Sequence, residues 1–136
     1  MRVETRARAR ALQAIYAWDL RGEKDLDRVS ARIWDDLAVS AEERQLASRL
    51  VHTLQQQQRD LDRQLADVTT NWRLERLGVI ERSVLRLAAA ELQRGETPTR
   101  VVLREAIRLA ERYGNPESAR FVNGVLDALA RQMGRL

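Results

Sequence analysis

The stretch TPTRVVLREAIRLAERYGNPESARFVNGVLDALARQMG, residues 97–134, predicts two consecutive helices with boundary signals at both ends. Apolar residues recur at intervals of three and four positions in both halves, which is the helical period. Each half opens with a capping residue and a proline and closes with a glycine, as helix boundaries often do. These boundary residues are Thr97, Pro98 and Gly114, followed by Asn115, Pro116 and Gly134.

The same period extends from this stretch to the N-terminus. Residues 79–95, VIERSVLRLAAAELQRG, predict one helix, and residues 70–78, TNWRLERLG, a short helical turn that ends at Gly78. Further upstream, Ser40 and Glu43 form a capping-box pattern that opens a long helix, and Asp25 is the expected cap of the helix before it. No segment predicts a strand. We therefore expect an all-α, single-domain helical bundle of about seven helices over residues 1–136.

The first helix, TRARARALQAIYAWDL at residues 5–20, combines an apolar stripe with three arginines at its start, and Thr5 is the expected N-cap. Around the helix, Arg10 and Arg6 lie about 160° and 120° from Leu12, whereas Arg8 lies about 40° from it, in line with the apolar stripe. Cations in the first turns are repelled by the positive end of the helix dipole, and a bound anion would relieve this repulsion. The alternative interpretation is an ordinary solvated face.

Composition limits the classes of function. Hydrophobic residues make up 44% of the chain and charged residues 32%, with no apolar run of membrane-spanning length and no signal peptide, so we expect a cytoplasmic protein. There is no cysteine and only one histidine, His52, so we expect no metal and no cofactor. The sequence has no glycine-rich phosphate-binding loop and no nucleophile motif, so we expect that the protein has no enzymatic activity.

Charge is distributed unevenly along the chain, whose formal net charge is +4. Both ends are basic and the middle is acidic, and Lys24 is the only base that is not arginine.

Two features of the last helix are unusual. Asn123 and Gly124 lie in its interior, where glycine is unfavourable by about 1 kcal/mol relative to alanine, so we expect another helix to pack closely over Gly124. Phe121 is the only phenylalanine, and the sequence leaves open whether its ring belongs to the core or forms a platform for a nucleic-acid base.

The chain resembles the NusB family of bacterial transcription antitermination factors in four segments: RARARALQAIYAWDL, LGVIERSVLRLAAAEL, VVLREAIRLAERYG and SARFVNGVLDALA. The resemblance covers nearly the whole chain. It implies an all-α fold of about seven helices that binds boxA-type single-stranded leader RNA together with NusE, a ribosomal small-subunit protein. The complex would act with RNA polymerase in the transcription of ribosomal RNA operons.

The resemblance also implies site residues. Arg6 and Arg8 match the family's basic N-terminal motif, Arg10 adds a further base, and Glu4 and Thr5 stand where arginines are usual. The other RNA-binding positions that the resemblance implies are Tyr16, Glu117 and Phe121. Glu75 and Glu81 match the region that docks NusE, and their charge suits a basic partner.

A second hypothesis is a helical module that dimerises through an exposed apolar face and binds no RNA. Salt-sensitive RNA binding would separate the two. A homodimer is compatible with both.

Overall fold

The computed structural model describes residues 2–69 and 73–136, which form six α-helices and one turn of 3-10 helix. The elements are α1 (Val3–Arg21), α2 (Leu26–Asp36), α3 (Ala41–Val68), the 3-10 turn η1 (Leu74–Arg76), α4 (Val79–Arg94), α5 (Thr99–Tyr113) and α6 (Pro116–Gln132). No strand occurs among the described residues, which confirms the all-α class. The expected count of about seven is reached only by including η1. Arg73 before this turn and Leu77 after it both have extended backbone angles, so the described part of the segment forms a single turn. Residues 70–72 of the expected turn lie outside the described ranges.

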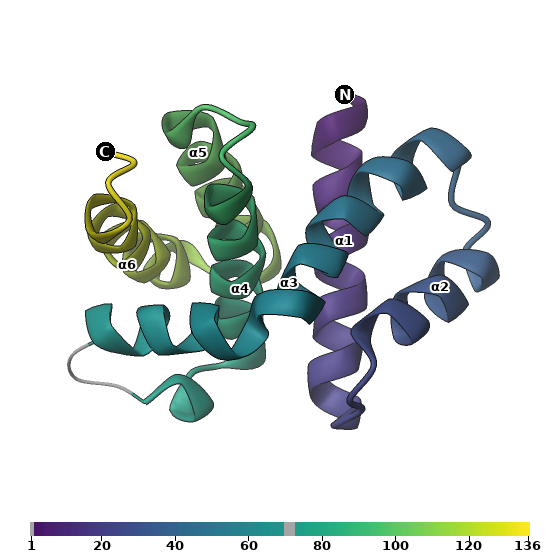
Figure 1. The fold of residues 1–136 in the computed structure, drawn as a ribbon, viewed down its shortest axis with the longest axis horizontal. Coiled ribbons are helices and arrows are strands. Elements are labelled where there is room, and N and C mark those ends of the chain that lie inside the picture. The colour runs from purple at the N-terminus through teal and green to yellow at the C-terminus, as the bar shows by residue number, and fades with distance from the viewer. Residues whose placement is uncertain (1, 70–72) are drawn as a thin grey trace.

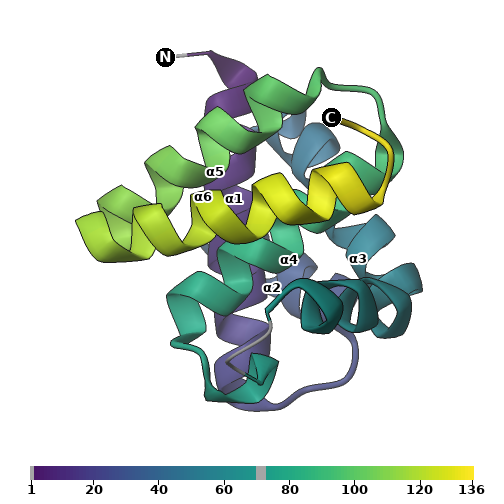
Figure 2. The same ribbon diagram turned by 90° about the vertical axis from the view of Figure 1, so that its left-hand side faces the viewer.

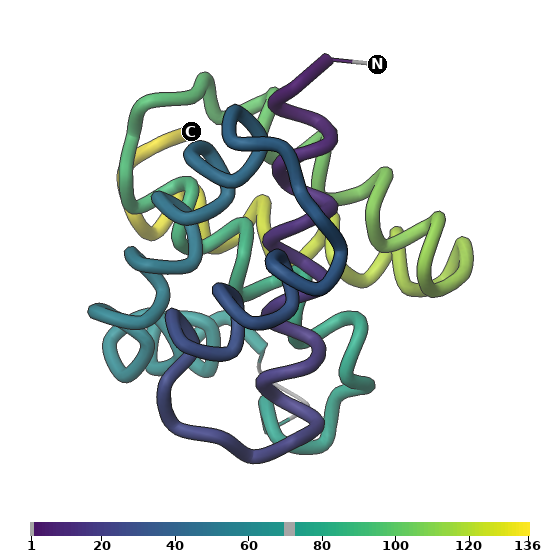
Figure 3. The backbone as a smooth tube through the Cα atoms, turned by 90° about the vertical axis from the view of Figure 1, so that its right-hand side faces the viewer, coloured from purple at the N-terminus to yellow at the C-terminus, as the bar shows by residue number. Residues whose placement is uncertain are grey.

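Helix α4 is the buried centre of the bundle. Residues 83–92 are all buried, and α4 packs against α1, α3, α5 and α6. Three consecutive alanines, residues 88–90, allow these neighbours to approach closely. In Figure 1, α1 stands upright between α2 on one side and α4, α5 and α6 on the other, while α3 crosses α1 and reaches α4. Figure 3 shows α2 lying across α1 on the side away from α6.

A buried arginine fastens three of these helices together. The Arg86 guanidinium of α4 donates to both carboxylate oxygens of Asp62 on α3, at 3.0 and 2.9 Å, and lies 3.5 Å from Asp19 on α1. Its planar head also lies 5.3 Å from the centre of the Trp18 ring. The charge is therefore both paired and stacked, as burial of an arginine requires. None of the helices in the described ranges has the length and apolarity needed to span a bilayer.

Three of the predicted N-caps are confirmed. The Asp25 and Asn115 side chains accept hydrogen bonds from the third backbone N–H of their helices, at 3.1 and 2.9 Å. Ser40 accepts from the backbone N–H of Glu43 at 3.3 Å, and its hydroxyl donates to the Glu43 carboxylate at 2.7 Å. Capping chemistry is local, so the sequence is sufficient to locate these helix starts.

Two predicted caps are wrong. Thr5 lies inside α1, which already begins at Val3, and its hydroxyl donates to Glu105 on α5 at 2.7 Å. Thr97 precedes α5 by two residues, because Pro98 has extended backbone angles (φ −55°, ψ 137°) and the helix starts after it.

The expected close packing over Gly124 is also wrong. Asn123 and Gly124 are exposed, and a Cβ added to Gly124 would meet no heavy atom within 4 Å. Helix α6 buries its opposite side, through Val122, Val125 and Leu126, so no neighbour in this structure requires a glycine here.

Candidate RNA and protein interface

The three arginines of α1 have different environments. The Arg6 and Arg10 Nε atoms lie 3.4 and 3.9 Å from the same oxygen of Glu43 on α3, and 45% of the Arg6 side chain is exposed. Arg10 also donates to Gln13 at 3.2 Å. Both guanidinium groups therefore remain accessible to an anion, with one carboxylate shared between them.

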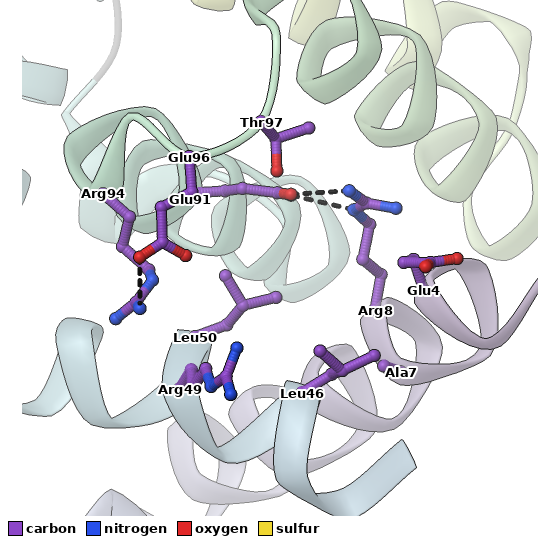
Figure 4. A pocket seen from close by; sticks show the side chains of 10 residues that line it. All are labelled: Glu4, Ala7, Arg8, Leu46, Arg49, Leu50, Glu91, Arg94, Glu96 and Thr97. Atoms are coloured by element: carbon purple, nitrogen blue, oxygen red, sulfur yellow. Dashed lines mark hydrogen bonds and ion pairs between the residues drawn. The ribbon is translucent and has the colours of Figure 1, made fainter. Parts of the chain in front are cut away.

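Arg8 is buried in an ion triad instead. Its Nε and Nη2 donate to the two carboxylate oxygens of Glu91 at 2.8 and 2.6 Å, and its Nη1 donates to Glu105 at 3.3 Å. Figure 4 shows the side chain extending from α1 to Glu91 across a cavity of about 90 Å³. The position in line with the apolar stripe is as predicted, but the phosphate contact expected of Arg8 conflicts with this geometry, because two buried carboxylates already occupy the guanidinium.

The triad also keeps Arg8 charged. Burial lowers the pKa of its guanidinium, but the hydrogen bond and charge of Glu91, with the charges of Glu105 and Glu4, outweigh burial and raise the pKa above its ordinary value. The residue therefore fastens the start of α1 to α4 and α5 as a permanent cation.

The start of α6 forms a second site with η1 and α4. A hollow of about 330 Å³ contains three of the predicted residues, Glu81, Glu117 and Phe121. The Phe121 side chain is partly buried and packs against the core, and it also lines the hollow, so core and surface roles are combined in one side chain. Glu117 lies exposed in the first turn of α6, where the helix dipole favours an anion. Tyr16 is 37% exposed on α1 and does not line this hollow.

The two predicted NusE residues are held differently. Glu75 on η1 is 75% exposed, with Arg73 at 4.0 Å. The Glu81 carboxylate accepts a hydrogen bond from the Ser118 hydroxyl at 2.7 Å and lies over Gly78, where a Cβ would collide with it. Glu81 thus ties the start of α4 to the start of α6.

The chain matches the model of one protein family over most of its length. The model of the NusB family matches residues 5–131. The chain belongs to the NusB family. Transcription antitermination protein NusB of Anaeromyxobacter dehalogenans is 46% identical over 127 residues, which cover 93% of this chain and 89% of that relative.

Solved structures of NusB proteins have the same fold. A structure of T. maritima NusB matches with a TM-score of 0.86 at 32% identity, covering 94% of this chain and 90% of that one. A crystal structure of antitermination factors NusB and NusE in complex with dsRNA matches with a TM-score of 0.86 at 30% identity, covering 97% of this chain and 98% of that one. The NusB-like bundle expected from the sequence is confirmed.

Three residues that take part in these two sites were not predicted from the sequence. Arg76 lines the hollow beside Glu117, and Ser118 orients Glu81. Glu105 accepts hydrogen bonds from both Thr5 and Arg8 of α1. The segment RLERLG indicated a basic residue near Gly78, but only the fold brings it to the start of α6.

Proposed function

We propose that this NusB-family chain is a cytoplasmic, single-domain transcription antitermination factor that binds boxA-type single-stranded leader RNA together with NusE. In this proposal it acts with RNA polymerase on ribosomal RNA operons and catalyses no reaction. The main support is its likeness to NusB relatives and to a NusB solved with NusE and RNA.

The geometry of the hollow suits a base better than a phosphate. Glu81 and Glu117 would repel a phosphate, whereas a carboxylate accepts hydrogen bonds from the amino groups of a base. The part of the Phe121 side chain that lines the hollow provides a surface on which the base stacks. Arg76, beside them, and Arg6 and Arg10 on α1 supply the phosphate contacts, and Tyr16 is the second stacking residue.

NusE is assigned to the surface around Glu75 and the start of α4. Glu75 is exposed and acidic, which suits a basic ribosomal protein. Since Glu81 also lies in the hollow, the NusE and RNA surfaces adjoin there.

A titration tests the proposal directly. A boxA-like RNA should bind more tightly than a scrambled RNA of equal length, and NusE should strengthen the specific binding. Equal affinity for both RNAs, with and without NusE, contradicts it.

A dimerising module without RNA binding is the second candidate. Tyr16 and Leu20, 37% and 58% exposed, lie one turn apart on α1 and form a small apolar strip. Concentration-dependent dimerisation, without salt-sensitive RNA binding, would favour this candidate.

A further inference from the structure

Helix α5 presents a row of four arginines that the proposed site does not use. Arg100, Arg104, Arg108 and Arg112 follow one another at intervals of four residues, and all four are exposed. A rise of 1.5 Å per residue makes this row about 18 Å long. Like charges four residues apart destabilise a helix, so the row is unfavourable for α5 itself and would be relieved by an anionic partner.

Carboxylates of the chain leave most of the row unneutralised. Among the described residues, Glu105 is the only carboxylate that pairs with Arg108, at 3.8 Å. That carboxylate already accepts hydrogen bonds from Arg8 at 3.3 Å and Thr5 at 2.7 Å. In the described part of the chain, no carboxylate lies within 4.0 Å of Arg100 or Arg104.

The row borders the groove between α1 and α5. This groove has a volume of about 900 Å³. It is lined by the exposed arginines Arg2, Arg104 and Arg108 and also by three acids, the exposed Glu4 and Glu96 and the buried Glu105. Figure 2 shows the N-terminal ends of α1 and α5 at the same end of the molecule.

The far end of the row is aromatic. Tyr113 is 41% exposed, and the Arg112 guanidinium lies 5.4 Å from the centre of its ring. Both residues line a small hollow with Ala9 of α1. Tyr16 lies seven residues beyond Ala9 on the same face of α1, about 10 Å along the helix axis. The row therefore extends from the N-terminal end of α5 toward Tyr16, a residue of the proposed RNA site.

We propose that the row Arg100, Arg104, Arg108 and Arg112 binds the phosphates of RNA that flanks the segment held at Tyr16 and Phe121. This inference rests on the function proposed above. RNA fits better than an acidic protein because the row ends in an exposed tyrosine with a stacked guanidinium, a surface that suits a base.

The test compares two triple variants with equal loss of charge. The row variant is Arg100→Gln, Arg104→Gln, Arg108→Gln. The control is Lys24→Gln, Arg28→Gln, Arg32→Gln, which removes three exposed bases with the same spacing on and just before α2, on the other side of α1 from α5 (Figure 1). Each protein is titrated with a boxA-like core RNA, with the same core carrying a scrambled single-stranded flank on its 5′ or 3′ side, and with poly-glutamate.

Wild type and control should bind one of the two flanked RNAs more tightly than the core RNA. The row variant should bind that flanked RNA and the core RNA with equal affinity. With about 0.7 of log–log salt slope for each single-strand phosphate, three lost contacts flatten the slope by about 2. The advantage of wild type over the row variant on flanked RNA should then shrink by about 20-fold between 50 and 200 mM salt.

Other outcomes overturn the inference in distinguishable ways. If wild type binds the core but gains nothing from either flank, the row proposal fails and the proposed function stands. If wild type binds neither RNA, both fail. Equal losses in the row and control variants would show a general charge effect, and poly-glutamate binding as tight as flanked RNA, lost in the row variant, would assign the row to an acidic protein.

Discussion

The ion triad of Arg8, Glu91 and Glu105 is the single-residue feature with the largest expected energetic effect. All three residues are at least nine-tenths buried, at 7%, 6% and 8% exposure. Removing one member of such a group leaves its partners charged and unpaired away from water. The raised pKa of Arg8 means that its stabilisation is fully present below its unfolded pKa and would be lost only as the pH rises through the higher folded value. Its contribution is therefore constant over the pH range of ordinary folding experiments.

We expect Arg8→Gln to lower the free energy of unfolding by about 3–5 kcal/mol, measured by urea denaturation, because Glu91 would stay buried without a cation and Glu105 would keep only the exposed Arg108. Arg108→Gln is the matched control. It removes the exposed partner of the same Glu105 and should change stability by less than about 1 kcal/mol. A loss of similar size in both variants would show that Arg8 is no more important than a surface arginine.

Phe121 combines two roles that substitution can separate. Phe121→Leu retains an apolar contact with the core and should change stability by less than about 1.5 kcal/mol. It removes the flat ring, so RNA affinity should fall by about 1–3 kcal/mol with the salt slope unchanged. Thermal unfolding measured beside RNA affinity distinguishes the two effects. RNA binding equal to wild type would place the ring in the core alone.

At the scale of elements, α6 carries an unfavourable glycine with no internal reason for it. Gly124→Ala should raise the free energy of unfolding by about 0.5–1 kcal/mol, because the added methyl group meets open space and alanine favours the helix. Urea denaturation measures the effect. A destabilised variant would mean that the surface over α6 is more crowded than this structure shows.

The junction between α4 and α6 should couple the two proposed surfaces. Glu75→Lys should weaken NusE binding and leave stability unchanged, because the Glu75 side chain is exposed and, among the described residues, its carboxylate pairs only with Arg73. Glu81→Lys should weaken NusE and RNA binding together, because it also breaks the hydrogen bond to Ser118. Pull-down with NusE and RNA titration provide the two measurements.

Ser118→Ala is the control for the Glu81 prediction. It removes the same hydrogen bond but keeps the carboxylate, so it should leave the charge attraction for NusE in place. A Glu81→Lys variant that binds NusE normally would move the protein interface elsewhere.

For the whole molecule, the uneven charge predicts salt-dependent RNA binding. Arg6→Gln with Arg10→Gln should flatten the log–log salt slope by up to about 1.4 and weaken specific and scrambled RNA alike, because phosphates carry no sequence information. Titrations at several salt concentrations measure the slope. Lys24→Gln with Arg28→Gln removes equal charge from the α2 side and should leave the slope unchanged. An unaltered slope in the α1 variant would remove these arginines from the proposed interface.

Most helices of this protein follow from local sequence patterns. The 3.6-residue period and the caps at Asp25, Ser40 and Asn115 depend on residues three or four positions apart, so they can be read without knowledge of the tertiary contacts. The same local logic misplaced Thr5 and Thr97. The Thr5 hydroxyl donates a hydrogen bond to Glu105 on another helix, 100 residues away in the chain, and no local pattern predicts that contact.

The partners of the site residues depend on how the helices pack together. The pattern of α1 placed Arg8 beside the apolar stripe, but its partners Glu91 and Glu105 lie 83 and 97 residues away in the chain, and no spacing rule connects them. The same holds for Glu81, which reaches Ser118 across 37 residues, and for the open space over Gly124. Periodicity tells which side of a helix is apolar, whereas the partner of a buried charge depends on which helices pack together, because an ion pair forms only across a few ångströms of space.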